Sequence, residues 1–324
     1  MRNQKLILTL LLLVTIFPGV AFSQIKDYPN REIEIAVASP PGGGHDNGMR
    51  ILGGELSKIL GVPIVVLNKP TGGGAGAAEY LLKAKPDGYT LLDLGHSDLI
   101  AQPIMTPEVS YKFTDFVPII QFGHQPYTFM VRGDSPFNVV TDLIVFARKN
   151  PGKLTGGVIT MGTTTHALFE SWRDAAGVDI GCIPYKGGTE LTTAVLGGHI
   201  DLGVSAIAPA VGLLKAGKMK ILVTTAKLKQ YPQVPTFGEL GFPEIKLQFY
   251  LTILAHRDTP KEIVDKLEKT MEKVLQNPSV IEKLDKFDLD AVVVKGKALV
   301  DSLEKEREDF IKVKDKMKKA IQGK

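Results

Sequence analysis

A strand-like run that ends in glycines stands near the start of the chain, where residues 32–46 read EIEIAVASPPGGGHD. The alternation over 32–38 is typical of a β-strand, and the prolines and glycines that follow end it. Met49 and Leu52 are spaced to share one face of a helix, which is expected to end at Gly61. A strand that turns through glycines into a helix exposes backbone N–H groups at the positive end of the helix dipole, where anions bind.

Strand and helix patterns alternate from there onward, which is typical of an α/β fold with a parallel sheet and crossover helices. Further strands are expected at 63–67, 89–94, 155–160, 180–183, 200–204 and 219–224. Further helices are expected at 74–83, 139–149, 164–176, 189–196, 209–216, 260–275, 279–284 and 299–319, the last one covering the first α/β unit.

Two long extended segments, 116–132 and 246–254, lie between two α/β units. If the final helices pack on the first unit, the chain passes twice between the units, at about 122–127 and about 246–252. Two such crossings form a hinge between domains, and a chain of 324 residues exceeds what one hydrophobic core usually organises. The expected division is a signal peptide at 1–23, domain 1 at 24–124 plus 248–324, and domain 2 at 125–247.

The first 23 residues have the three parts of a secretory signal peptide. Arg2 and Lys5 precede an apolar run over 6–17, which is too short to cross a membrane. A small-residue site ends at Ser23, and we expect cleavage there and a periplasmic product. Without this leader the chain carries 37 basic and 35 acidic side chains. So close a balance gives no phosphate-neutralising surface, and we expect no nucleic-acid partner.

Two other glycine-containing turns occur. The run 72–77 contains GxGxxA, but four residues separate it from the preceding strand, whereas a dinucleotide fingerprint begins at the strand end. We interpret it as a flexible turn. The turn at 162–166, GTTTH, lies between a strand and a helix of the second unit, and its hydroxyl groups cap the helix or donate to a ligand. Two turns of this kind, facing each other, would hold a carboxylate from both sides.

Catalytic and metal-binding patterns are weak in this sequence. The six histidines show no HExxH or HxxxH spacing, and no GxSxG motif occurs. Cys182 is the only cysteine and lies in an expected strand, which favours an inert buried thiol. Asp46, at the start of a helix, either caps its N–H groups or contacts a ligand through water. We expect no catalytic residue, no metal and no cofactor.

A series of short motifs runs through the chain in order: Tyr28-Pro29, Pro41-Gly42-Gly43-Gly44-His45-Asp46 with Arg50, Asn68-Lys69-Pro70, Pro86-Asp87-Gly88-Tyr89-Thr90, Asn150-Pro151-Gly152-Lys153-Leu154, Pro184-Tyr185-Lys186-Gly187-Gly188, Gly197-Gly198-His199-Ile200-Asp201, Ala216-Gly217-Lys218, Val234-Pro235-Thr236 and Thr259-Pro260. This ordered set resembles the substrate-binding proteins of tripartite tricarboxylate transporters, the Bug receptors. The resemblance covers essentially the whole chain after the leader.

The resemblance implies a two-domain periplasmic binding protein fold of type II, the Venus-flytrap arrangement, which closes on a small ligand. In such receptors the first strand–helix loop and a facing loop of the second domain hold a carboxylate, partly through ordered waters. Relatives commonly carry a small or hydroxyl residue where His45 stands and a serine where Thr163 stands. The ligand-binding residues that it implies are Gly42, Gly43, Gly44, His45, Asp46 and Ser97 in domain 1, and Gly162, Thr163, His166, Tyr185 and Ser205 in domain 2.

We therefore expect a monomeric, non-catalytic receptor that captures a small carboxylate, a di- or tricarboxylate or a related organic acid, in the cleft between its domains. The resemblance implies delivery of that ligand to the membrane subunits of a tripartite tricarboxylate transporter. Two alternatives remain from the sequence. One is an enzyme acting on a small carboxylate with His45 or His166 as general base, and the other is a ligand-sensing partner of a sensor kinase.

Overall fold

The computed structural model describes residues 27–106, 109–245 and 247–321, and the expected signal peptide lies outside them. The strands are β1 Ile33–Val37, β2 Ile64–Asn68, β3 Thr90–Leu94, β4 Phe116–Arg132, β5 Thr155–Ile159, β6 Gly181–Tyr185, β7 Leu202–Ala206, β8 Met219–Thr224, β9 Gln248–His256 and β10 Asp290–Lys295. The helices are α2 Gly44–Leu60, α3 Ala75–Lys83, α4 Gln102–Met105, α5 Val140–Lys149, α6 Thr164–Ala176, α7 Gly188–Leu196, α8 Val211–Lys215, α9 Lys261–Leu275, α10 Pro278–Asp285 and α11 Gly296–Ile321, with a π-helical turn at Ser97–Ala101.

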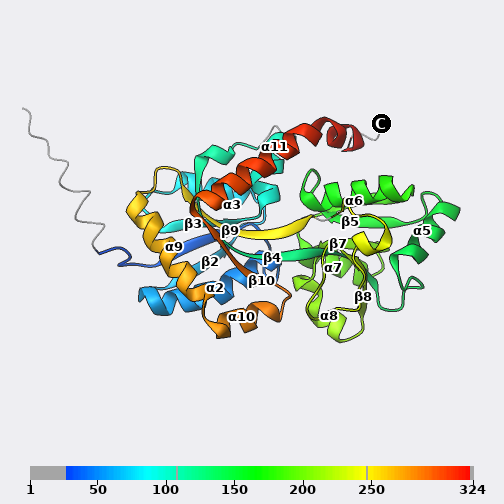
Figure 1. The fold of residues 1–324 in the computed structure, drawn as a ribbon, viewed down its shortest axis with the longest axis horizontal. Helices are drawn as coiled ribbons and strands as arrows, with labels where there is room; N and C mark the ends of the chain where they lie inside the picture. Colours follow the sequence, from blue (N-terminus) through cyan, green and yellow to red (C-terminus); the bar gives the residue numbers. More distant parts are fainter. Residues whose placement is uncertain (1–26, 107–108, 246, 322–324) are drawn as a thin grey trace, which may run out of the picture.

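The described strands follow one path, β2-β1-β3-β9-β4-β7-β5-β6, with β8 and β10 also paired to β4. The molecule is elongated, with one lobe at each end of this path (Figure 1). We call β1–β3, β9, β10, α2–α4 and α9–α11 the first lobe, and β5–β8 with α5–α8 the second lobe. Strand β4 runs through both lobes.

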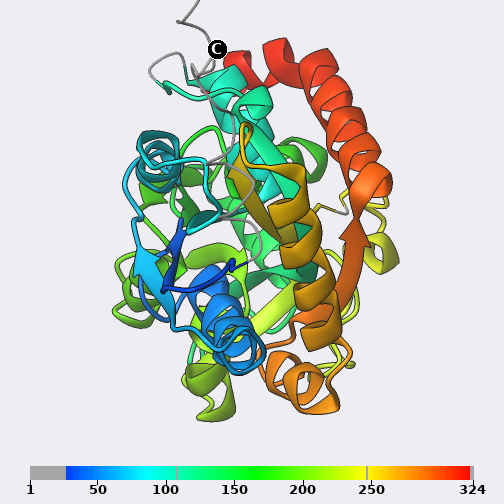
Figure 2. The same ribbon diagram turned by 90° about the vertical axis from the view of Figure 1, so that its left-hand side faces the viewer.

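The first lobe is built on a parallel β2-β1-β3 sheet that β9 extends in the antiparallel direction. Its core contains Ile35 of β1, Leu52 of α2 and Leu267 of α9, all fully buried. The C-terminal segment α9, α10, β10 and α11 lies along one side of this lobe (Figure 2). Leu299 and Leu303 of α11 are buried against the lobe, as expected for a final helix that covers the first unit.

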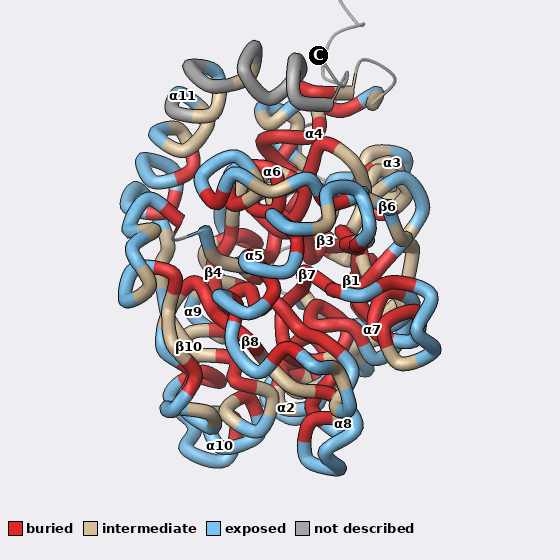
Figure 3. The backbone as a smooth tube through the Cα atoms, turned by 90° about the vertical axis from the view of Figure 1, so that its right-hand side faces the viewer, coloured by how far each residue is buried: buried red, intermediate tan, exposed pale blue. Residues whose placement is uncertain are grey.

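The second lobe places parallel strands β7, β5 and β6 beside the end of β4. An aromatic cluster fills its core, in which Phe129 of β4 meets Trp172 and Phe169 of α6 edge-on or tilted. Buried backbone runs through the centre of both lobes, while the outer turns of α5, α8 and α10 are exposed (Figure 3).

Strands β4 and β9 connect the lobes. Phe116 to Pro126 of β4 pair antiparallel with β9, whereas Tyr127 to Met130 pair with β7 of the second lobe. The expected extended segments and the two crossings are confirmed as parts of this strand pair. The sheet is mixed rather than purely parallel, because β4, β9, β8 and β10 all pair in the antiparallel direction.

Most predicted elements lie within two or three residues of the observed ones, and the bounds of α6, β4 and β8 agree. Two features were missed. The π-helical turn with α4 carries Pro103 inside a short apolar stretch, and β10 is a short strand of mostly intermediate burial that pairs with β4 outside the main strand path. Neither has the sustained periodicity that sequence reasoning requires.

A buried glycine provides a test of packing in the second lobe. A Cβ on Gly156 of β5 would lie 2.6 Å from two ring atoms of Phe169, which is fully buried. We expect Gly156→Ala to lower the free energy of unfolding by about 1–3 kcal/mol through overpacking. Urea denaturation measures this change.

Gly54→Ala is the matched control, because Gly54 lies on an exposed face of α2 with nothing within 4 Å of an added Cβ. Alanine is favoured over glycine in a helix by about 0.5–1 kcal/mol, so this variant should be slightly more stable than the wild type. Equal unfolding midpoints for Gly156→Ala and the wild type would contradict the packing described.

Candidate ligand-binding site

The loop between β1 and α2 is held in shape by the Asp46 carboxylate. Its Oδ1 accepts hydrogen bonds from Arg50 Nε at 2.9 Å and Asn68 Nδ2 at 2.8 Å. Its Oδ2 accepts from the backbone N–H of Gly42 at 2.9 Å. Burial alone would raise the pKa of Asp46, but the Arg50, Gly42 and Asn68 donors together hold it below its ordinary value. Asp46 therefore braces the loop.

The depressed pKa of Asp46 has a consequence for acid stability. A lowered folded pKa adds stability that is present above the ordinary pKa near 4 and is lost as the pH falls through the folded value. We expect Asp46→Asn to be less stable than the wild type at pH 7 by about 1–3 kcal/mol. The difference should shrink between pH 5 and pH 3, which denaturant unfolding at each pH measures. A constant difference across this range would contradict the assignment.

The turn between β5 and α6 is organised by threonine hydroxyl groups. Thr163 Oγ1 donates to the backbone carbonyls of Ile159 and Thr160, the latter at 2.9 Å. Thr165 Oγ1 accepts from the Ile159 N–H at 2.9 Å. In the first turn of α6, the backbone N–H of Thr164 donates to Ser97 Oγ of the first lobe at 2.6 Å. This hydrogen bond links the two lobes directly.

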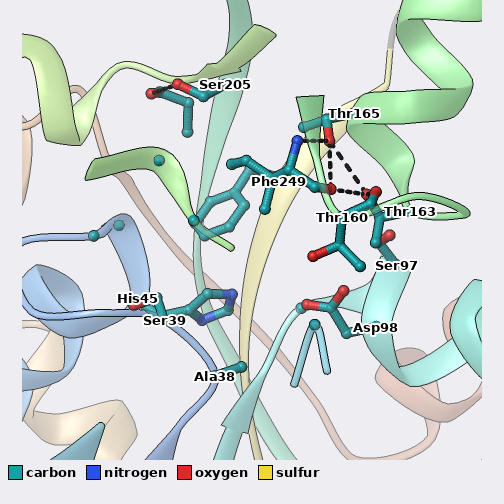
Figure 4. Close-up of a pocket in the computed structure, with 18 of the residues that line it drawn as sticks. Ala38, Ser39, His45, Ser97, Asp98, Thr160, Thr163, Thr165, Ser205 and Phe249 are labelled. Carbon is teal, nitrogen blue, oxygen red and sulfur yellow. Dashed lines mark hydrogen bonds between the residues drawn. The ribbon is translucent and has the colours of Figure 1, made fainter. Parts of the chain in front are cut away.

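A cavity lies between the lobes and is lined by residues of both (Figure 4). It encloses about 760 Å³, part of it open to solvent. Residues that line it include Gly44, His45, Asp98, Thr163, Ser205 and Phe249.

The N-termini of three helices meet at this cavity. Gly43 and Gly44 line it at the start of α2, Thr163 at the start of α6, and Gly187 and Gly188 at the start of α7. The first N–H groups of a helix have no partner within the helix. Among the described residues, none accepts a hydrogen bond from the N–H groups of the first two residues of α2. The cavity is therefore surrounded by backbone donors and positive dipole ends, which suit an anion.

His45 adds a side-chain nitrogen to this wall. The ring is 4% exposed, its Nδ1 lies 3.0 Å from Asp93 Oδ1, and Phe249 packs edge-on at 4.6 Å between centroids. Nε2 is buried and has no hydrogen-bond partner among the described residues. Burial would lower the pKa of His45, but the Asp93 carboxylate, with Asp98 adding to it, raises the pKa above the usual imidazole value. The Asp93 carboxylate thus stabilises the protonated ring.

Asp98 places a carboxylate in the same cavity. It follows β3 on the π-helical turn and is half-buried, and its carboxylate makes no hydrogen bond or ion pair with the described part of the chain. Burial raises the pKa of Asp98 to about 7, although the nearby His45 works in the opposite direction. An acidic group that binds its proton more tightly in the folded state stabilises the protein at low pH and loses that contribution as the pH rises through 7.

Removal of this unpartnered charge should therefore stabilise the empty protein. We expect Asp98→Asn to raise the free energy of unfolding at pH 8 by on the order of 1–3 kcal/mol, because the ionised carboxylate no longer has to be buried. At pH 5 the folded wild type keeps the proton, so the gain should be smaller than at pH 8. Thermal unfolding without ligand at the two pH values measures this; a gain that is larger at pH 5 would refute the assignment.

His96 connects the cavity wall to the outermost helix of the first lobe. Its ring lines the cavity and stacks on Tyr250 with 4.4 Å between centroids. Nδ1 lies 2.8 Å from Glu306 Oε2 on α11, and Nε2 lies 3.1 Å from Thr252 Oγ1 on β9. A carboxylate only accepts, so Nδ1 donates to Glu306, while Nε2 shares a hydrogen bond with the threonine hydroxyl, which can donate or accept.

The structure brings six of the eleven residues predicted for the site to the cavity and leaves five away from its lining. Those that line it are Gly43, Gly44, His45, Ser97, Thr163 and Ser205. Those that do not are Gly42, Asp46, Gly162, His166 and Tyr185. The part that each residue plays in ligand binding stays a prediction.

His166 lies behind the α6 turn. Its Nδ1 accepts from the Gly162 N–H at 3.2 Å, and its Nε2 is 3.7 Å from Glu170. Burial, with Arg173 adding to it, lowers the pKa of His166 to about 4. One ligand atom each from His166, Glu170 and Cys182 lie within 4.8 Å of one another. Since Nδ1 accepts a hydrogen bond, Nε2 of the neutral ring carries its proton and offers no lone pair to an ion.

Sequence reasoning missed Asp98, Phe249 and the turn at 186–188, all of which line the cavity. The turn at 186–188 carries the same signal as the first loop, since its KGG sequence joins a strand to a helix. Phe249 and Asp98 carry no local signal, because their placement depends on how β9 and the π-helical turn pack in three dimensions.

Two α/β lobes joined by a shared strand pair, with a cavity between them that three helix N-termini face, define the class of periplasmic binding proteins. Residues 49–314 match the family model described as "Tripartite tricarboxylate transporter family receptor", and the chain belongs to this family. None of the described helices is long and apolar enough to cross a membrane.

Relatives support this assignment over nearly the whole chain. The chain is 32% identical over 277 residues to the "UPF0065 protein in gbd 5'region" of Cupriavidus necator, covering 83% of this chain and 82% of the relative. The periplasmic binding protein BugD has a TM-score of 0.84 at 27% identity, covering 90% of this chain and 98% of BugD. The structure "R. palustris Rpa4515 with adipate" has a TM-score of 0.85 at 28% identity, with the same coverage of 90% and 98%.

Proposed function

We propose that this chain is an extracytoplasmic receptor that binds a small carboxylate in the cavity between its lobes and delivers it to the membrane subunits of a tripartite tricarboxylate transporter. One observation carries the proposal: three helix N-termini and the unpartnered Nε2 of His45 face one cavity. The adipate bound by the relative Rpa4515 supports a carboxylate as the ligand class.

Several weak donors have to act together in this site. One helix terminus contributes about 0.3–2 kcal/mol toward an anion, whereas micromolar affinity requires about 8 kcal/mol. We assign this task to the backbone N–H groups at the starts of α2, α6 and α7, the His45 ring and the Thr163 hydroxyl group. The Thr163 hydroxyl donates to backbone carbonyls, so its oxygen would reach a carboxylate through a bridging water. Exclusion of water strengthens each of these interactions when the lobes close.

We infer that the lobes act as domains divided at 24–124 plus 248–324 and 125–247, and that they move about β4 and β9. Two contacts across the cleft support a closed arrangement of the lobes. Ser97 Oγ accepts from the Thr164 N–H, and Thr189 Oγ1 donates to the carbonyl of Pro41 at 3.3 Å. A ligand that contacts both lobes would favour this closed form over an open one.

We propose export to the periplasm by the signal peptide at 1–23, with cleavage after Ser23, and action as a monomer without catalysis. The position of one candidate general base supports a receptor. His166 does not line the cavity and lies behind its turn, where its Nδ1 accepts a hydrogen bond from the Gly162 N–H. A role as the ligand-sensing partner of a sensor kinase would use the same cavity and differ only in the protein that docks.

A thermal-shift screen of small carboxylates tests the proposal. A ligand at 100 times its dissociation constant stabilises the folded state by about 2.7 kcal/mol, which should raise the melting temperature by several degrees. Mass analysis of the recovered ligand should show it unchanged. A converted ligand would instead establish an enzyme, and a screen in which no carboxylate raises the melting temperature would refute the carboxylate receptor.

Thr163→Val tests the second-lobe turn in the same assay. We expect the dissociation constant of the best acid to rise by about tenfold, because a polar contact to a charged ligand or its water is lost. Thr193→Val is the matched control, since Thr193 is exposed on α7 and its hydroxyl also donates to a backbone carbonyl, that of Thr189 at 2.9 Å. Similar affinities for the two variants would remove Thr163 from the site.

A further inference from the structure

Two ionisable side chains of the first lobe converge on one point of the cavity wall (Figure 4). A Cβ placed on Gly95 would lie 3.3 Å from His45 Nε2 and 3.6 Å from Asp98 Oδ2. All three residues line the cavity. Because Gly95 has no side chain, no Cβ stands between the imidazole and the carboxylate, and a ligand group in the cavity that all three residues line can approach both.

The residues behind this pair determine what each partner offers. Asp93 accepts from His45 Nδ1 and raises the pKa of the ring, and when the ring is protonated its Nε2–H is a donor toward the cavity. Asp98, in its ionised form, presents only acceptor oxygens. The pair thus offers one charged donor and one charged acceptor within about 7 Å of each other, since both lie within hydrogen-bonding or contact range of the same point.

We propose that His45 and Asp98 select carboxylates that carry a hydrogen-bond donor, a hydroxyl or an ammonium group, on the carbon next to the carboxylate. One carboxylate oxygen of the ligand accepts from His45 Nε2, and the adjacent donor bonds to Asp98. This inference rests on the proposed function and deepens it, because it names the class of acid.

A plain dicarboxylate satisfies only half of this pair. It leaves Asp98 without a donor, or places a second carboxylate against it, and both situations oppose binding. The carboxylate of Asp98 makes no hydrogen bond with the described residues that would explain it as a structural group. Burial raises its pKa to about 7, so the measurements below are made at pH 8, where the carboxylate is mostly ionised.

Matched acids that differ only in the substituent on the second carbon provide the test. Succinate, malate and aspartate form one series, and glutarate, 2-hydroxyglutarate and glutamate form another. Isothermal titration calorimetry with the full mature chain gives the dissociation constants. We expect the hydroxy or the amino member of at least one series to bind tenfold or more tightly than the plain acid.

Variants at the pair assign the selectivity to it. Asp98→Ala should reduce the preference to less than threefold, and Gly95→Ala should do the same, because its methyl group fills the space between the two side chains. Asp98→Asn keeps a carbonyl acceptor without the charge, so it should retain a hydroxy acid but lose an ammonium-bearing one. Asp174→Ala, at an exposed position on α6, is the control and should keep the wild-type preference.

The outcomes separate the inference from the proposed function. If the wild type binds plain acids as tightly as their hydroxy and amino analogues, or if Asp98→Ala and Gly95→Ala keep the preference, the inference is overturned while the carboxylate receptor stands. If no acid binds at millimolar concentration, the proposed function is refuted and the inference with it. Loss of the preference in both variants supports the pair.

Discussion

The pairing of β4 with β9 is the constraint on which the two-lobe arrangement depends. A single strand of 17 residues pairs with β9 over its first part and with β7 and β8 over its last part, so both lobes share one continuous backbone. The register of β4 against β9 shifts twice, between Pro118 and Ile120 and between Gln121 and Gly123. Such bulges bend and twist a strand pair. The lobes are therefore joined by a bent ribbon that limits the directions in which they can move.

The same arrangement explains why backbone donors face the cavity although both lobes have apolar cores. Strands β1, β5 and β6 pass through short turns into helices whose N-termini lie at the cavity, and the first two N–H groups of α2 have no acceptor among the described residues. Partial charges of this kind attract anions without discriminating strongly among them. Ionisable side chains are contributed by His45, with Asp93 behind it, and by Asp98. The helix N-termini thus attract anions in general, whereas His45 and Asp98 are the side chains that we propose select among them.

Much of the fold was readable from local sequence. The PPGGGHD turn, the helix at 164–176 and the long strand at 116–132 were predicted because glycines, apolar spacing and β-rich runs act over a few residues. The glycine turns also led to four residues that line the cavity, Gly43, Gly44, His45 and Thr163, whereas Ser97 and Ser205 came from the family resemblance. Asp46 illustrates the limit of this reasoning. The sequence allowed a cap or a ligand contact, whereas the structure shows a brace whose partner Asn68 comes from another strand.

Asp98 and Phe249 could not be predicted for a different reason. Their positions depend on contacts between segments far apart in the chain, such as the approach of His45 to Asp98 over Gly95 and the packing of Phe249 on the His45 ring. No periodicity or spacing within one segment encodes such contacts. The domain boundaries and the ligand-binding role of each lining residue stay predictions, since they concern movement and binding.

The hydrogen bond between His96 and Glu306 connects the wall of the cavity to helix α11 on the outside of the molecule. The same imidazole forms part of the cavity surface and holds α11 in place, with β9 bonded to its other nitrogen. A ligand that turns this ring must either break the bond to Glu306 or pull the helix with it. A change in the orientation of the His96 side chain within the cavity would in this way be coupled to the position of α11 on the outside of the molecule.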